Sequence, residues 1–211
     1  MEHLIFDLDG TIIDSREEIK ANYEVVFRQI PPKQPVDTAG LDYSINITEL
    51  LKSVYGNDEA KVGLAKRLFS EKYDNSNFSA TPLYEGIVDA LRFLHGRGHR
   101  LYIATNKRMI PTTRILELKG IRQLFADIFA NEMIPGRSLP KPVMLAELKN
   151  RYQMSTGFMI GDSIGDLVAA RKAGLTAVAV GWGYENREVL MTGTPDYFIT
   201  SIENLCTFVN L

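Results

Sequence analysis

Cysteine is nearly absent from this chain of 211 residues, in which Cys206 is the single example. One thiol excludes a disulfide bond within the chain and a metal cluster built on several thiolates. A chain without disulfides is typical of a reducing compartment, so we expect the protein in the cytoplasm.

Long apolar runs and an excess of one charge are also lacking. No stretch reaches the roughly 18 consecutive apolar residues that indicate a membrane span, and Glu2, Asp7 and Asp9 make the first segment unlike a signal peptide. The 24 Lys and Arg residues nearly balance the 26 Asp and Glu residues, for a net charge of -2. The sequence therefore favours neither nucleic acid nor a membrane as a partner.

What is present is an ordinary globular composition, with 45% apolar and 24% charged residues. These values exclude a wholly disordered, collagen-like or coiled-coil chain. At about 150 residues per domain, the length is compatible with one domain carrying an insertion or with two unequal domains.

Short apolar runs recur along the chain, and each one stops at polar residues. They occupy residues 4–6, 101–104, 158–160 and 176–180. Continuous apolar strands of this length are typical of a parallel sheet that is covered on both faces.

Helical patterns separate these runs. Ile87, Leu91 and Leu94 have the spacing of one buried helical stripe. Pro111 is expected at the first position of a second helix that Gly120 would end. Because strands and helices alternate, we predict a doubly wound, Rossmann-like α/β fold with a mostly parallel sheet.

Residues 14 to about 80 break this alternation. Residues 17–30, 47–55 and 58–73 have helical patterns, and no convincing strand lies among them. We therefore predict an α/β core formed by residues 1–13 and 82–211, with an inserted all-helical domain at residues 14–81.

Polar side chains gather where the predicted strands end. The carboxyl ends of parallel strands meet at one edge of a sheet, where ligands bind, so residues distant in sequence are expected to converge there. The expected set is Asp7, Asp9, Thr105, Asn106, Lys141, Asp162 and Asp166.

This set is acidic and rich in oxygen donors. In an extended segment, Asp7 and Asp9 point to the same face because strand side chains alternate. With Asp162 they form the hard ligand set that suits Mg²⁺. An alternative is that Asp9-Gly10 forms the tip of a β-hairpin, although a hairpin does not explain the polar ends of the other strands.

Single residues have simpler interpretations as well. Thr105 could cap the following helix, Lys141 could be a solvated lysine, and Asp166 could be an acid in the first turn of a helix. For Trp182 and Tyr184, packing at an edge or a partner surface is favoured over contact with a ligand.

Four segments in order resemble the motifs of the haloacid dehalogenase-like hydrolases, in particular the phosphoglycolate phosphatase-like branch with a small helical cap. The segments are Phe-Asp-Leu-Asp-Gly-Thr at 6–11, Ile-Ala-Thr-Asn-Lys at 103–107, Pro-Lys-Pro at 140–142 and Gly-Asp-Ser-Ile-Gly-Asp at 161–166. The resemblance spans nearly the whole chain and implies that the helical insertion is a cap domain.

The resemblance also implies roles for the acidic residues. Asp7 would be the nucleophile that forms an aspartyl phosphate, and Asp9 would be the general acid and base. Mg²⁺ would be held by the Asp7 carboxylate, the backbone carbonyl of Asp9 and Asp162. Asp166 would orient Lys141 or a metal-bound water.

The remaining implied roles concern the transferred phosphate. Thr105 and Lys141 would bind its oxygens with help from Asn106. The expected partner is a small phosphorylated metabolite such as phosphoglycolate, a sugar phosphate, a nucleotide or pyrophosphate. A monomer and a homodimer both remain open.

The implied activity is a Mg²⁺-dependent phosphatase acting on a small phosphomonoester. The acid two residues after Asp7 favours phosphoryl transfer over the dehalogenase and phosphonatase chemistries of the family. A sugar-phosphate mutase is an alternative, but residues 14–80 lack the histidine that such mutases use. A pyrophosphatase and a non-catalytic phospho-ligand binding protein also remain open.

Overall fold

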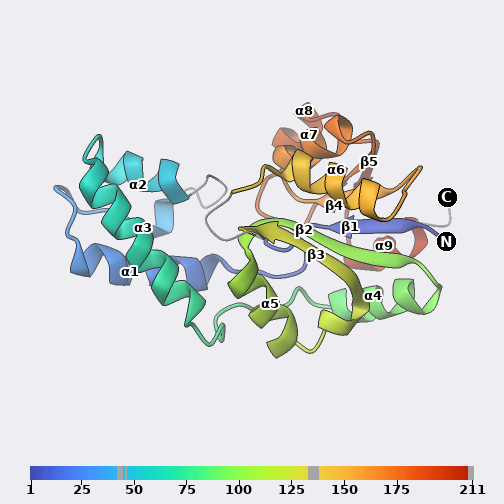
Figure 1. Cartoon of the computed structure of the whole chain (residues 1–211), viewed down its shortest axis with the longest axis horizontal. Coiled ribbons are helices and arrows are strands. Elements are labelled where there is room, and N and C mark those ends of the chain that lie inside the picture. Colours follow the sequence, from blue (N-terminus) through green and yellow to red (C-terminus); the bar gives the residue numbers. More distant parts are fainter. Residues whose placement is uncertain (42–44, 46, 133–137, 209–211) are drawn as a thin grey trace. The chain divides into compact units, whose positions relative to one another are not determined.

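The computed structural model describes residues 1–41, 45, 47–132 and 138–208. It divides into two compact units (Figure 1). The first unit comprises Met1–Asp14 and Leu83–Leu211, and the second comprises Ser15–Pro82.

The first unit is built on a six-stranded sheet. In chain order its strands are β1 (His3–Phe6), β2 (Arg100–Arg108), β3 (Phe125–Asn131), β4 (Phe158–Gly161), β5 (Thr176–Val180) and β6 (Tyr197–Ile199). Their spatial order is β3-β2-β1-β4-β5-β6, and every neighbouring pair is parallel. This is the Rossmann order, in which the direction of winding reverses between β1 and β4.

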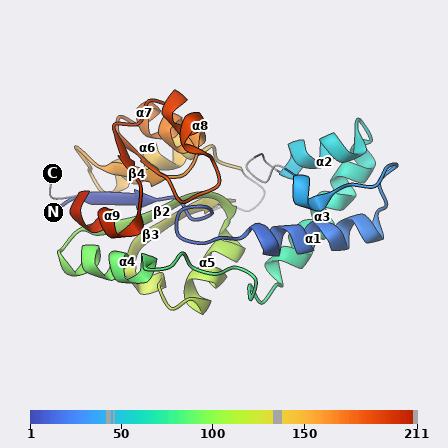
Figure 2. The same ribbon diagram turned by 180° about the vertical axis from the view of Figure 1, so that it is seen from behind.

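Helices cover both faces of this sheet (Figures 1 and 2). One face carries α6 (Lys141–Arg151), α7 (Ile164–Lys172) and α8 (Arg187–Thr192). The other face carries α4 (Ile87–Gly96), α5 (Met109–Leu118) and α9 (Ile202–Phe208), and a short 3-10 helix, Arg122–Leu124, precedes β3. The predicted doubly wound α/β fold is therefore confirmed.

Alternation along the strands builds a separate core on each face. Ile5, Tyr102 and Met159 belong to the core beneath α6 and α7, together with Leu145 and Leu167 from those helices. The neighbouring residues of β1 are also completely buried. Burial on both faces explains why the central strands are apolar throughout rather than alternating.

The structure corrects some boundaries of this unit. Strands β3 and β6 were not predicted, and β2 extends beyond the expected residues 101–104 to Arg108. Pro111 lies in the first turn of α5 but at its third position rather than its first. That position still tolerates proline, because the first N–H groups of a helix have no acceptor within it.

The described residues of the second unit form helices and connecting loops but no strand, as the sequence pattern predicts. It contains α1 (Arg16–Gln29), the 3-10 helix Thr38–Gly40, α2 (Ile47–Tyr55) and α3 (Glu59–Asp74). Its own core includes Tyr23, Val26, Leu50, Leu51 and Ala65. Asp58 begins α3 by accepting a hydrogen bond from the backbone N–H of Lys61.

Within the described residues, we find no helix that is both long enough and apolar enough to span a membrane.

Candidate active site

The candidate site lies where the winding of the sheet reverses. Asp7 directly follows β1, and Asp162 directly follows β4. The backbone N–H of Asp7 donates to the carbonyl of Ile160 at 2.9 Å, so the β1 chain stays paired with β4 up to this point. The crevice outside such a reversal is the usual ligand site of an open α/β sheet.

A tight loop of residues 8–13 follows β1 and is called the β1 loop below. The carbonyl of Leu8 accepts hydrogen bonds from the N–H groups of Ile12 and Ile13 at 2.9 and 3.1 Å. Gly10 has a φ of 76°, a conformation that glycine adopts without strain. The hairpin interpretation of Asp9-Gly10 is wrong, because both partners of β1, which are β2 and β4, are parallel to it.

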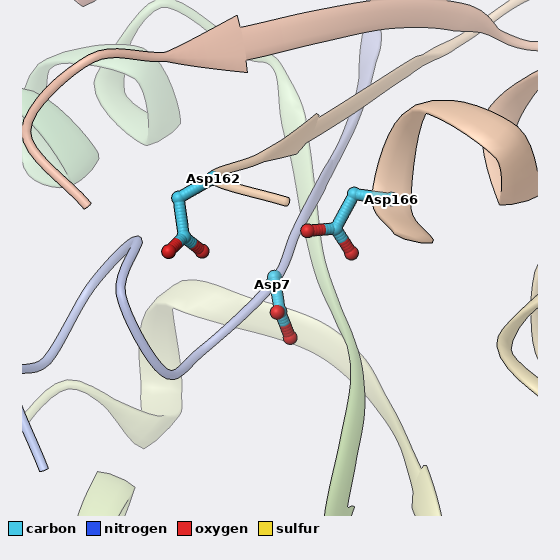
Figure 3. A group of neighbouring side chains, drawn as sticks. All are labelled: Asp7, Asp162 and Asp166. Carbon is cyan, nitrogen blue, oxygen red and sulfur yellow. The ribbon is translucent and has the colours of Figure 1, made fainter. Parts of the chain in front are cut away.

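Three carboxylates meet beside this loop. Asp7, Asp162 and Asp166 each offer an oxygen, and these oxygens lie within 4.8 Å of one another. Figure 3 shows the three side chains lying near one another, at the end of β1, the end of β4 and the start of α7. All three residues are buried, so water screens little of the repulsion between their ionised forms.

Lys141 supplies the positive charge of this cluster. Its ammonium lies 3.0 Å from Asp7 Oδ2 and 2.5 Å from Asp166 Oδ1, and its side chain is 5% exposed. Burial alone would lower the pKa of Lys141, but the two adjacent carboxylates raise it above its ordinary value. The interpretation of Lys141 as a solvated lysine is therefore wrong.

Asp166 is held by three donors, which makes it a partner of Lys141 rather than an open ligand. Besides Lys141, the backbone N–H and the hydroxyl of Ser163 donate to Asp166 Oδ2 at 3.1 and 2.6 Å. Ser163 also caps α7, so the pair forms a capping box. Asp166 is thus an acid in the first turn of α7 that also accepts a hydrogen bond from Lys141.

Asp162 accepts a hydrogen bond on each carboxylate oxygen. The Thr11 hydroxyl donates to Oδ1 at 3.1 Å, and the Tyr184 N–H donates to Oδ2 at 2.8 Å. Burial raises the pKa of Asp162 to about 8, the nearby Asp166 and Asp7 charges add to this, and the two donors oppose it. Such a carboxylate is stabilised in its charged form by a cation.

Asp7 has an unsatisfied oxygen. Its Oδ1 is buried and has no hydrogen-bond partner among the described residues. Burial raises the pKa of Asp7 to about 7, Lys141 opposes the rise, and Asp166 and Asp9 add to it. An unpartnered carboxylate oxygen beside a second buried carboxylate fits a hard divalent cation, so these residues suit Mg²⁺.

Asp9 is paired with a lysine to which the sequence pattern assigned no role. Its Oδ1 lies 3.0 Å from Lys107 Nζ, and the lysine side chain is only 6% exposed. The register with β3 shifts between Thr105 and Arg108. A register shift at this point interrupts the regular alternation of side chains at the end of β2, and such irregularities are common beside active sites.

The two residues of β2 that are expected to bind phosphate differ in burial. Thr105 is buried, and its Oγ1 accepts a hydrogen bond from the Lys107 N–H at 3.2 Å. It does not cap the next helix, because the N-cap of α5 is Arg108, so the capping interpretation is wrong. Asn106 is exposed and is not part of the buried cluster.

Several contacts of the site were not predicted from the sequence. The contact between Ser163 and Asp166 could have been predicted, because Ser followed three residues later by an acid at the start of a helix indicates a capping box. Trp182 and Tyr184 follow β5, so the rule that placed the other strand-end residues applies to them as well. The contact of Thr11 with Asp162 has no local signal, because 151 residues separate the two.

The sequence of the chain is similar to those of known phosphatases. A sequence model of haloacid dehalogenase-like hydrolases matches residues 1–174. The chain is 30% identical to a phosphoglycolate phosphatase of Vibrio cholerae, over 98% of this chain and 96% of that protein. It is 27% identical to a 5'-nucleotidase of Pseudomonas aeruginosa, over 96% of this chain and 93% of that protein.

The fold has close likenesses among solved structures. The crystal structure of a predicted phosphatase from Clostridium acetobutylicum has a TM-score of 0.87 and 23% identity, with 99% of this chain and 97% of that chain covered. This likeness agrees with the sequence matches above, which show that the chain belongs to the haloacid dehalogenase-like hydrolase family, as its four motifs predict.

Proposed function

We propose that this enzyme is a Mg²⁺-dependent phosphatase that hydrolyses a small phosphomonoester through an aspartyl phosphate on Asp7. The observation that carries the proposal is the environment of the Asp7 carboxylate. One oxygen lies 3.0 Å from the Lys141 ammonium, and the other is buried without a partner among the described residues. Asp7 therefore offers a nucleophile beside a fixed positive charge.

In the first step, Asp7 attacks phosphorus. A bond forms between a carboxylate oxygen and phosphorus, and the bond from phosphorus to the ester oxygen breaks. Asp9 donates a proton to the leaving oxygen, so that the alcohol departs neutral. In the second step, Asp9 takes a proton from water as that water attacks phosphorus, which releases inorganic phosphate and restores the Asp7 carboxylate.

The main barrier to this chemistry is repulsion between an anionic nucleophile and an anionic ester. Lys141 and Thr105 would bind the phosphoryl oxygens, and the exposed Asn106 would assist them. Mg²⁺, held by the Asp7 and Asp162 carboxylates and the Asp9 carbonyl, supplies the additional positive charge when it is bound. Preorganised charges in a site without water are usually the largest contribution to such catalysis.

The two units would have different roles in the reaction. The α/β unit carries every residue with a proposed chemical role, so we assign it as the catalytic core. The helical unit, residues 15–82, is assigned as the cap domain that selects the substrate. The relatives act on different compounds by name, a phosphoglycolate and a nucleotide. Both of these compounds are phosphomonoesters, which supports that class for this enzyme.

The proposal is tested by phosphate release from a panel of metabolites. The panel contains phosphoglycolate, sugar phosphates, nucleoside monophosphates and pyrophosphate, each assayed with Mg²⁺ and with excess EDTA. We expect release from at least one monoester that requires Mg²⁺. The absence of turnover on every compound would favour the non-catalytic binding protein, turnover of pyrophosphate alone would favour the pyrophosphatase, and an isomerised sugar phosphate without release would favour the mutase.

A further inference from the structure

A loop that follows β5 contacts both segments that carry the proposed metal ligands. Trp182 Nε1 donates to the backbone carbonyl of Thr11 at 3.0 Å. Two residues later, the N–H of Tyr184 donates to Asp162 Oδ2 at 2.8 Å. A few residues of one loop therefore hold the β1 loop on one side and the end of β4 on the other.

The glycine between these two residues leaves no space beside Asp162. A Cβ atom on Gly183 would lie 2.1 Å from Asp162 Cβ and 2.5 Å from its Oδ2. On the opposite side, a Cβ atom on Gly10 would lie 1.9 Å from the same Oδ2. The Asp162 side chain is thus packed between two glycines, and neither backbone can carry a larger residue without displacing it.

The same loop also secures the turn beyond Asp162. Glu185 Oε2 accepts a hydrogen bond from the N–H of Ile164, at the start of α7, at 2.9 Å. On the other side of the carboxylate, the Thr11 hydroxyl donates to Asp162 Oδ1 at 3.1 Å. Thr11 therefore links Trp182 to Asp162, because it accepts a hydrogen bond from the first and donates one to the second.

We propose that Trp182, Gly183 and Tyr184 form a clamp that holds Asp162 in the orientation needed to bind the metal ion. Trp182, whose ring is half-buried, is a positioning residue in this clamp. The inference rests on the metal site of the proposed function. Groups that orient a metal ligand commonly contribute about 10- to 100-fold to metal affinity.

Titration with Mn²⁺, followed by electron paramagnetic resonance of the full-length chain, measures this contribution without substrate. Gly183→Ala is expected to weaken Mn²⁺ binding by about tenfold or more, because the new methyl group displaces Asp162. Gly183 has no positive φ, so alanine is otherwise tolerated. Gly96→Ala is the matched control, because a Cβ on Gly96, the last residue of α4, would have nothing within 4 Å, and Mn²⁺ affinity should not change.

A second set of variants separates positioning from general packing. Trp182→Phe keeps an aromatic ring but removes the N–H donor, and Thr11→Val removes the hydroxyl donor at nearly constant shape. Each is expected to weaken Mn²⁺ binding by about tenfold, and Thr11→Ser should restore the affinity. If Trp182 acts through Thr11, the double variant loses little more than either single variant, because coupled effects are not additive.

The outcomes are decisive for variants that circular dichroism shows to be folded. The clamp would be overturned if Gly183→Ala and Trp182→Phe bound Mn²⁺ as tightly as the parent. It would also be overturned if the loss of Mn²⁺ affinity in the Trp182→Phe, Thr11→Val double variant equalled the sum of the losses in the two single variants. If Gly183→Ala does not fold, the Trp182 and Thr11 variants carry the test alone. A parent that binds Mn²⁺ but releases no phosphate refutes the proposed function and leaves the clamp standing.

Discussion

Replacing Asp7 by asparagine is expected to lower phosphatase turnover by about 10⁴-fold or more, the scale of loss when a covalent nucleophile is removed. The amide has nearly the same shape but cannot form the acyl phosphate. The variant should remain folded, because Lys141 keeps its contact with Asp166 at 2.5 Å. The measurement is phosphate release from the best substrate of the panel, with the melting temperature recorded alongside.

Asp127→Asn is the matched control for this prediction. Asp127 also pairs with a cation, since its Oδ2 lies 2.8 Å from the guanidinium of Arg151 at the end of α6, but neither residue belongs to the acidic cluster. Turnover of the control should equal that of the parent. Turnover at the parental level in Asp7→Asn would show that Asp7 is not the nucleophile.

Lys141→Met is expected to reduce both stability and turnover. The side chain neutralises two buried carboxylates, and removing one partner of a buried ion pair typically costs about 3–5 kcal/mol, because the remaining charge is left uncompensated. For a chain of this size that corresponds to a fall of about 10 °C in melting temperature. Because we propose that this ammonium binds the phosphoryl oxygens, its loss should also lower turnover by about 10²–10³-fold.

Two further variants isolate the electrostatic cause. Lys149→Met, the same substitution on the same helix, removes hydrogen bonds to the carbonyls of Ala173 and Gly174 at 3.0 and 3.1 Å. Because these groups reach water, the loss of stability should be about 1 kcal/mol.

Adding Asp166→Asn to Lys141→Met should restore part of the melting temperature. Lys141→Met with the melting temperature of the parent would show that the buried carboxylates do not depend on this lysine.

The sequence predicted the centre of the sheet well and its edges poorly. Strands β1, β2, β4 and β5 are buried on both faces, which requires the uninterrupted apolar runs that were recognised. In β3, Asp127 interrupts the run because it pairs with Arg151 and Tyr152 at the edge. Strand β6 is a run of only three apolar residues, and Tyr197 is exposed, so β6 lacks the burial on both faces that marks the central strands.

The same contrast applies to the site. The rule that strand ends converge brought Asp7, Lys141 and Asp162 together correctly, because it depends only on the order of strands and helices. The pairing of Asp9 with Lys107 depends on a bulge, and the contact of Trp182 with Thr11 joins loops 171 residues apart. Loop conformations of this kind follow from tertiary packing rather than from local pattern.

Trapping the covalent intermediate would identify the nucleophile itself. Asp9→Asn should accumulate the intermediate with p-nitrophenyl phosphate. The first step still proceeds, because this leaving group needs little acid catalysis, but attack by water is slow because the general base is missing. Borohydride reduces an aspartyl phosphate to homoserine, which peptide mass spectrometry locates. We predict homoserine at position 7, formed only with Mg²⁺ and substrate. Homoserine at another position, or none while phosphate is released, would contradict the proposed mechanism.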